Sequence, residues 1–187
     1  LSRVIWCCFF TVIFVLLMGQ RKQLVEDLRY LWTHKKQFWS LAAASLFISV
    51  NWFIYIWAVT NDHVLQTSLG YYINPLISVV FGMIFFQEKL SKATVVAVVI
   101  AAMGVFVLAI QSGAIPWVAL LLAFSFAIYG VLKKKIVLDA TRGLAIETLF
   151  MVPLALGYYM YLWSAGTPSF LQVDLKTDML MIVSGIV

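Results

Sequence analysis

Residues 63–86 read HVLQTSLGYYINPLISVVFGMIFF, and this stretch is the most informative part of the chain. As a helix it is long enough to cross a membrane, since about 20 apolar residues span the hydrocarbon core of a bilayer. Five of its polar side chains recur every three or four residues, which places these five on one helical face. They are His63, Thr67, Tyr71, Asn74 and Ser78. The pattern predicts a transmembrane helix with one polar face.

Pro75 lies within this polar face. Proline has no backbone N–H, so it removes one helical hydrogen bond and can kink or break the helix. Membrane carriers often build binding sites where a helix is interrupted near the middle of the bilayer. We therefore expect the face to line a cavity and Pro75 to mark a helix break. The alternative is that the polar residues only hydrogen-bond to neighbouring helices.

The composition extends the membrane interpretation to the whole chain. Hydrophobic residues make up 64% of it and charged residues 11%, whereas soluble domains are about half apolar and about a quarter charged. The net charge of +5 does not indicate nucleic-acid binding, because the basic residues form short clusters between apolar runs. We expect an all-α integral membrane protein, a polytopic helical bundle whose partner is the lipid bilayer.

Hydropathy predicts six membrane spans, at about 2–19, 39–60, 64–86, 93–111, 115–132 and 143–163. A seventh begins near Thr177. The chain begins with Leu1 and ends inside an apolar run, so we expect it to be a fragment of a longer protein. The fourth span carries a ridge of small residues, typical of a packing helix. The ridge is formed by Ala93, Ala97, Ala101 and Gly104.

The basic residues predict the orientation. Eleven of the thirteen fall in the loops 20–38, 87–92 and 133–142. The positive-inside rule places these loops on the cytoplasmic side, and we expect the protein to lie in the inner membrane. Within the first loop, apolar residues recur at helical spacing from Leu24 to Trp32. That pattern predicts an amphipathic helix on the membrane surface, with a solvated linker as the alternative.

Two other spans contribute polar pairs at helical spacing. Asn51 and Tyr55 lie in the second span, and Ser125 and Tyr129 in the fifth. An unpaired amide at mid-membrane would be costly. Aromatic rings beside a few polar groups suit a partly apolar organic ligand, so we add these four residues to the expected substrate cavity.

Two charges lie at the ends of spans. Arg3 opens the first span and is assigned a possible charge role, and Glu147 lies near the start of the sixth. Charges inside a membrane are costly and often functional. For Glu147 we expect a functional charge that holds a cationic group or takes up a proton. The alternatives are an interfacial helix cap or an ion pair with Arg142.

Motifs of known enzymes are absent from the sequence. It has no His-Glu-x-x-His, no Gly-x-Ser-x-Gly and no glycine-rich phosphate loop. The two cysteines, Cys7 and Cys8, are adjacent in an apolar run and form neither a disulfide framework nor a metal site. We expect no catalytic residue, no metal and no cofactor.

Three stretches resemble the RarD subfamily of EamA transporters, within the drug/metabolite transporter superfamily. They are residues 51–59, 68–76 and 123–130, and residues 146–149 fit the family as well. The similarity runs along essentially the whole chain. Two positions depart from the family pattern, namely Gln87, where Gly is frequent, and Ser2, where His is frequent.

The resemblance implies a bacterial permease of ten helices in two inverted five-helix repeats. Residues 1–111 would be the first repeat without its first helix, and 112–187 the second, truncated in its third helix. The implied function is a secondary carrier that moves a small organic solute by alternating access. A non-transporting membrane scaffold or assembly protein is the alternative, and a membrane-embedded enzyme ranks third. The substrate, the coupling ion and the oligomeric state do not follow from the sequence.

Overall fold

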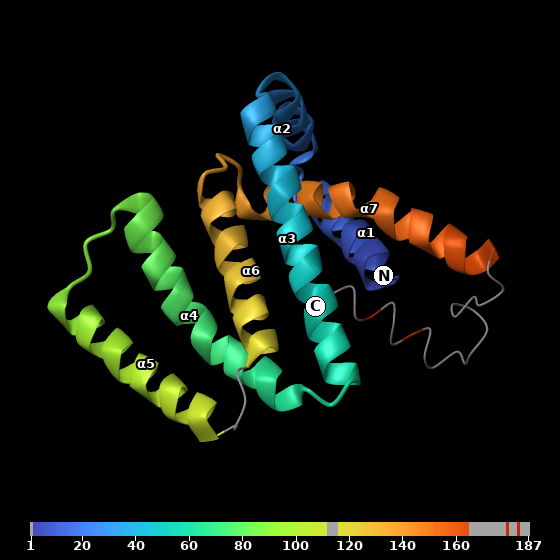
Figure 1. Ribbon diagram of the computed structural model, residues 1–187. Helices are drawn as coiled ribbons and strands as arrows, with labels where there is room; N and C mark the ends of the chain where they lie inside the picture. Colours follow the sequence, from blue (N-terminus) through green and yellow to red (C-terminus); the bar gives the residue numbers. More distant parts are fainter. Residues whose placement is uncertain (1, 112–115, 165–178, 180–182, 184–187) are drawn as a thin grey trace. The chain divides into compact units, whose positions relative to one another are not determined.

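The described part of the chain consists of helices and connecting loops, without a strand. The computed structural model describes residues 2–111, 116–164, 179 and 183 (Figure 1). The helices are α1 (Ser2–Leu17), α2 (Arg21–Thr33), α3 (Lys35–Thr60), α4 (Val64–Phe86), α5 (Lys92–Gln111), α6 (Trp117–Lys134) and α7 (Ala140–Ser164). The expected all-α fold is confirmed.

Five of these helices are long and apolar enough to span a membrane: Lys35–Thr60, Val64–Phe86, Lys92–Gln111, Trp117–Lys134 and Ala140–Tyr158. They correspond to five of the six predicted spans, so a multi-pass membrane protein is confirmed. The remaining one, α1, has 16 residues. At 1.5 Å per residue it covers about 24 Å, less than the roughly 30 Å of the hydrocarbon core. The predicted seventh span lies almost wholly outside the described residues.

Contacts divide the chain into two compact units. One contains the described residues of 1–45 and 136–187, and the other contains residues 46–135. The division passes through α3 and differs from the two predicted repeats. The repeats 1–111 and 112–187 therefore remain a prediction.

The unit of residues 46–135 is organised by the packing of α4 against α6, which lie side by side (Figure 1). Small residues allow this close approach. A Cβ atom added to Gly70 would lie 3.3 Å from the Cα and the carbonyl oxygen of Ala119, and 3.4 Å from the Cβ of Leu122. Leu69 and Ile73 of α4 are buried beside Ala119 and Ala123. Without a hydrophobic driving force in lipid, such close packing is what holds helices together.

The other helices of this unit are held less tightly. Contacts join α5 to α4, but α5 has no buried residue among those described, so its side chains are available to lipid or to other protein. The role of its small-residue ridge stays a prediction. At one end, the Lys134 ammonium of α6 pairs with Glu88, just beyond α4, and lies 4.5 Å from the centre of the Phe86 ring.

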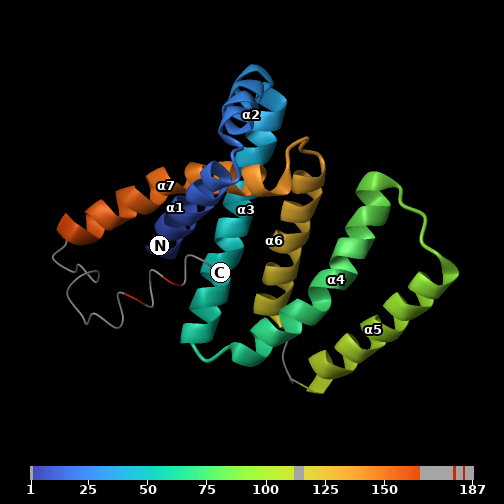
Figure 2. The same cartoon turned by 180° about the vertical axis from the view of Figure 1, so that it is seen from behind.

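In the other unit, α1 packs along α7 and α2 contacts both (Figure 2). Its apolar core joins these helices to the beginning of α3. The buried core residues are Val15, Leu24, Leu31, Leu41, Ala145 and Ile146. The predicted helix in the first loop is thus confirmed as α2. Leu24 and Leu31 face the core, while Val25, Leu28 and Trp32 are exposed, so a second apolar face is available for the predicted contact with the membrane surface.

The contact at Gly70 gives a prediction that compares two glycines. Gly70→Ala should lower stability relative to Gly104→Ala by about 1–3 kcal/mol, because a backbone neighbour cannot move aside for the new methyl group. Both changes gain the same helix propensity, and an added Cβ at Gly104 meets nothing within 4 Å. Thermal unfolding in detergent measures the difference. Equal melting temperatures for the two variants would contradict the close packing.

Candidate functional site

A small hollow in the unit of residues 46–135 brings three helices together. Polar and aromatic side chains dominate its lining, which consists of Asn51, Tyr55, Thr67, Gly70, Tyr71, Asn74, Leu122 and Phe126. Five of these, Asn51, Tyr55, Thr67, Tyr71 and Asn74, are residues that the sequence assigns to a substrate cavity. Their placement around one hollow is a finding. That they bind a substrate remains a prediction.

Asn51 ties α3 to α6 at the edge of this hollow. Its side-chain Nδ2 donates to the carbonyl oxygen of Leu122 at 2.8 Å and to the Oγ of Ser125 at 2.8 Å. The Ser125 hydroxyl in turn donates to the Leu122 carbonyl at 3.1 Å. Two predicted residues, Asn51 and Ser125, therefore interact directly, and the amide avoids the cost of an unpaired polar group in the membrane. Ser125 is buried and is not among the residues that line the hollow.

The predicted polar face of α4 divides into a bonded part and an open part. Thr67 is buried, and its hydroxyl donates to the carbonyl of Val64 at 2.7 Å. Ser78 lies beyond the hollow, where its hydroxyl donates to the Oδ1 of Asn74 at 3.3 Å. The ring of Tyr71 meets that of Tyr55 edge to face, with centroids 6.0 Å apart. The face thus supplies an amide, a hydroxyl and a phenol to one side of the hollow.

Helix α4 runs through Pro75 without an interruption, which differs from the helix break that the sequence suggests. One missing N–H does not divide a helix whose neighbouring turns remain bonded. Pro75 has no N–H to donate to the carbonyl of Tyr71, four residues earlier. The carbonyl that loses this helical hydrogen bond therefore belongs to Tyr71, which lines the hollow.

Some lining residues are missing from the prediction, and some predicted residues do not line the hollow. Sequence reasoning overlooked Gly70, Leu122 and Phe126, which carry no polar side chain to signal a role. It also overlooked Gln66, whose Oε1 accepts the backbone N–H of Val118 at 3.3 Å and joins α4 to α6. Tyr129 is not part of the lining, and its ring meets that of Phe126, with centroids 5.8 Å apart.

Glu147 belongs to the other unit and is deeply buried, with 2% of its surface exposed. The sequence placed it near the first turn of its helix, but α7 begins earlier, at Ala140. Asp139 caps that end, since its Oδ1 accepts the backbone N–H of Thr141 at 3.0 Å. Glu147 therefore lies about two turns inside the helix, beyond the first turn in which the helix dipole acts. The side chain of Arg3 lies outside the described part of the structure.

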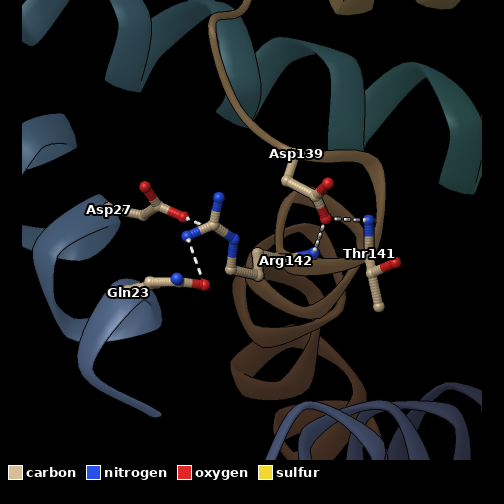
Figure 3. A network of polar contacts seen from close by, with 5 residues as sticks. All are labelled: Gln23, Asp27, Asp139, Thr141 and Arg142. Atoms are coloured by element: carbon tan, nitrogen blue, oxygen red, sulfur yellow. Dashed lines mark hydrogen bonds and ion pairs between the residues drawn. The ribbon is translucent and has the colours of Figure 1, made fainter. Parts of the chain in front are cut away.

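Arg142 is engaged with α2 (Figure 3). Its Nε lies 3.3 Å from the Oδ2 of Asp27, and its Nη1 donates to the Oε1 of Gln23 at 3.4 Å. Burial raises the pKa of the Asp27 carboxyl above its usual value, and the Arg142 guanidinium offsets part of that rise. Like charge on Asp139 and Glu26 raises the pKa further. The carboxylate is thus held in place at an energetic cost.

The described lining of the hollow carries no charged side chain. Amide, hydroxyl and phenol groups can donate and accept hydrogen bonds, and the aromatic rings offer apolar faces. The volume of about 30 Å³ holds only a few waters. An organic solute would need the hollow to widen or to be completed by other parts of the protein.

Comparison with known proteins agrees with the membrane architecture. Residues 1–110 match the EamA-like transporter family. The chain is 49% identical over 161 residues to the "Uncharacterized transporter YojE" of Bacillus subtilis, a match that covers 85% of this chain and 53% of that protein. It is 40% identical over 185 residues to "Protein RarD" of Escherichia coli, covering 99% of this chain and 61% of that protein.

A more distant relative is the "Chloramphenicol-sensitive protein RarD" of Pseudomonas aeruginosa, 32% identical over 164 residues, with 86% of this chain and 54% of that protein covered. The chain thus spans between about half and three fifths of the length of these relatives. No solved structure matches it. The relative from Bacillus subtilis is named a transporter and the one from Escherichia coli a RarD protein. These names agree with the expectation that the chain is not an enzyme.

The Asn51 amide provides a second prediction. Asn51→Ala should cost about 1 kcal/mol of stability, because interhelical hydrogen bonds in membranes contribute on the order of 0.6–2 kcal/mol. Asn61→Ala is the matched control, since Asn61 is exposed and its amide donates only within its own chain segment, to the carbonyl of Trp57 at 2.8 Å. Thermal unfolding of both variants in detergent measures the effect. A loss at Asn61 as large as that at Asn51 would remove the evidence for the interhelical bond.

Proposed function

This chain belongs to the EamA-like transporter family, and from that premise we propose that the protein is a secondary transporter of the inner membrane. It moves a small organic solute across the bilayer by alternating access. The predicted inverted repeats supply the two halves that rock against each other, as in other carriers built from repeats. A gradient drives the movement.

The observation that carries the proposal is the hollow between α3, α4 and α6. A helix that faces only lipid gains nothing from polar side chains, and a helix held by hydrogen bonds needs them only at its contacts. Asn51 and Ser125 are such contact residues, because they hydrogen-bond to each other between α3 and α6. Asn74 and Tyr71 line the hollow instead, and Tyr71 is 63% exposed. Polar groups that line a hollow within membrane helices are suited to a solute that passes through it.

The lining also supports a substrate class. An uncharged surface of amide, hydroxyl and aromatic groups suits a solute that is neutral where it contacts the hollow, with a ring or other apolar part and a few hydrogen-bonding groups. Chloramphenicol, which appears in the name of the relative from Pseudomonas aeruginosa, has this chemistry and serves as a first probe.

The test uses the full-length protein in proteoliposomes, with flux of radiolabelled chloramphenicol as one measurement. Single cysteines in a background without Cys7 and Cys8 give a second measurement that needs no substrate. We expect Asn74→Cys and Ser78→Cys to react with small water-soluble thiol reagents, since both side chains lie on the polar face. Labelling of Asn74→Cys should block flux, because the label occupies the hollow.

Val79→Cys and Phe86→Cys are the controls for this experiment, because they lie on another face of the same helix. They should react more slowly and leave flux unchanged. Equal reactivity at all four positions would indicate that the polar face only packs against neighbouring helices. If chloramphenicol is not transported but the labelling pattern is as expected, chloramphenicol is the wrong probe. The proposal of a cavity would then still hold.

For Glu147 we propose a coupling role, in which the carboxyl takes up a proton or holds a cationic group. Its support is the burial of the side chain within a membrane helix, two turns from the helix end. Charged side chains within membrane helices are rare, and they often belong to ion or proton pathways. A cap at the helix end is the weaker explanation, because Asp139 already occupies that position.

Glu147→Gln tests the coupling role. The change keeps the shape of the side chain, so we expect a folded protein whose flux no longer depends on a pH gradient. Flux in proteoliposomes with and without that gradient measures the effect. Glu88→Gln is the control, since Glu88 is exposed and pairs with Lys134 at the end of α4. Unchanged flux and unchanged pH dependence in Glu147→Gln would rule the role out.

A further inference from the structure

The guanidinium of Arg142 spans one turn of α2. Asp27 and Gln23 are four residues apart on that helix and face the same way, and Arg142 reaches both, at 3.3 Å and 3.4 Å (Figure 3). Figure 3 shows the two side chains of α2 pointing toward the beginning of α7. One side chain thus fastens two helices that are more than a hundred residues apart in the sequence.

The backbone beneath Arg142 is fixed as well. The Oδ1 of Asp139 accepts the N–H of Thr141 at 3.0 Å and that of Arg142 at 3.5 Å. An aspartate in this position stabilises the first turn of a helix. Arg142 therefore projects from a rigid turn, and a movement of α7 would carry the guanidinium with it.

Apolar contacts accompany the ion pair. On α2, Leu24 and Leu31 flank Asp27 at helical spacing and are 8% and 2% exposed. They belong to the same core cluster as Ala145 and Ile146, one turn beyond Arg142 on α7. The contact between α2 and α7 is therefore a small apolar seal with a charged pair at its edge.

The energetics of the pair favour two discrete states. The two side chains are mostly covered, with 19% of Arg142 and 18% of Asp27 exposed. Burying a pair costs about as much as its attraction returns, whereas separating the partners while one stays buried is strongly unfavourable. Burial raises the pKa of Asp27 despite the neighbouring guanidinium, which is the sign of such a balance. The pair is stable when it is closed or when both partners reach water, and unstable in between.

We propose that the Asp27–Arg142 pair is a latch between the two predicted repeats that must open each time the transporter changes access. The inference rests on the proposed transport function, because α2 falls in residues 1–111 and α7 in 112–187. In alternating access, some contacts between the two repeats close one side of the protein in one state and open in the other. The closed pair holds α2 against α7 in the described state, and its opening lets the two helices separate.

The first experiment measures opening without measuring transport. A cysteine at Ala145, which is fully buried in the seal, reports on the contact by its reaction with a small water-soluble thiol reagent. The protein is full-length, reconstituted and free of Cys7 and Cys8. Asp27→Asn and Arg142→Gln should each raise the labelling rate of Ala145→Cys roughly tenfold, within the range usual for coupled sites.

The controls separate a latch from a general loss of structure. Glu26→Gln removes an exposed carboxylate whose like charge opposes the ionised form of Asp27, so it should not raise the labelling rate. The exchanged pair Asp27→Arg with Arg142→Asp should restore slow labelling. Equal labelling in Asp27→Asn and Glu26→Gln would overturn the proposal, and so would a lower melting temperature of Asp27→Asn without faster labelling.

Transport is measured separately, so that the two proposals can fail independently. If opening of the latch limits the transport cycle, Asp27→Asn changes the kcat for chloramphenicol flux. Glu26→Gln should keep the kcat of the unmodified protein. If flux is absent from every form, including the unmodified protein, the choice of solute or the transport function fails, and labelling still decides whether the seal opens. Faster labelling with kcat unchanged in Asp27→Asn would contradict a role in the transport cycle.

Discussion

The close approach of α4 to α6 at Gly70 is the contact on which the described site depends. Because Gly70 has no side chain, its backbone lies against that of Ala119, and Leu122 follows one turn later on α6. This brings the carbonyl of Leu122 to a position where the Asn51 amide of α3 can reach it. A larger residue at position 70 would crowd the backbone of Ala119 and strain both the hydrogen bond and the hollow. Apolar burial does not drive helices together in a bilayer, so close packing of this kind supplies much of the stability of the contact.

The polar groups of this unit fall into two classes with different physical roles. Asn51 and Ser125 satisfy each other and the Leu122 carbonyl, so they hold helices together. Asn74 and Tyr71 line the hollow, and the Asn74 amide has more donors and acceptors than its bond to Ser78 uses. These hydrogen bonds favour the packing alternative for Asn51 and Ser125, whereas for Asn74 and Tyr71 the cavity stays a prediction. The cavity interpretation is now a proposal about specific side chains.

Much of the helix arrangement follows from local patterns, and the contacts do not. Hydropathy locates α3 to α6 within a few residues, because membrane spans depend on length and polarity alone. The same local reasoning placed Thr67, Tyr71 and Asn74 on one face of α4. It could not pair Asn51 with Leu122 or Arg142 with Asp27, since those partners lie far apart in the sequence. It also missed Gly70, whose contribution is the absence of a side chain, and it started α7 too late because the polar residues before Gly143 read as a loop.

The charged side chains to which we assign roles lie outside the unit that contains the hollow, and this has a consequence for how a solute could be coupled to movement. The described lining of the hollow is uncharged, whereas Glu147, Asp27 and Arg142 all belong to the other unit. A neutral lining lets a solute shed its water without meeting an uncompensated charge, which is costly in a medium of low polarity. Charged groups are better placed where states are exchanged, because a buried ion pair is stable when it is closed or fully solvated and unstable in between. Binding by hydrogen bonds and ring contacts, with movement controlled by charges elsewhere, is the division that this distribution favours.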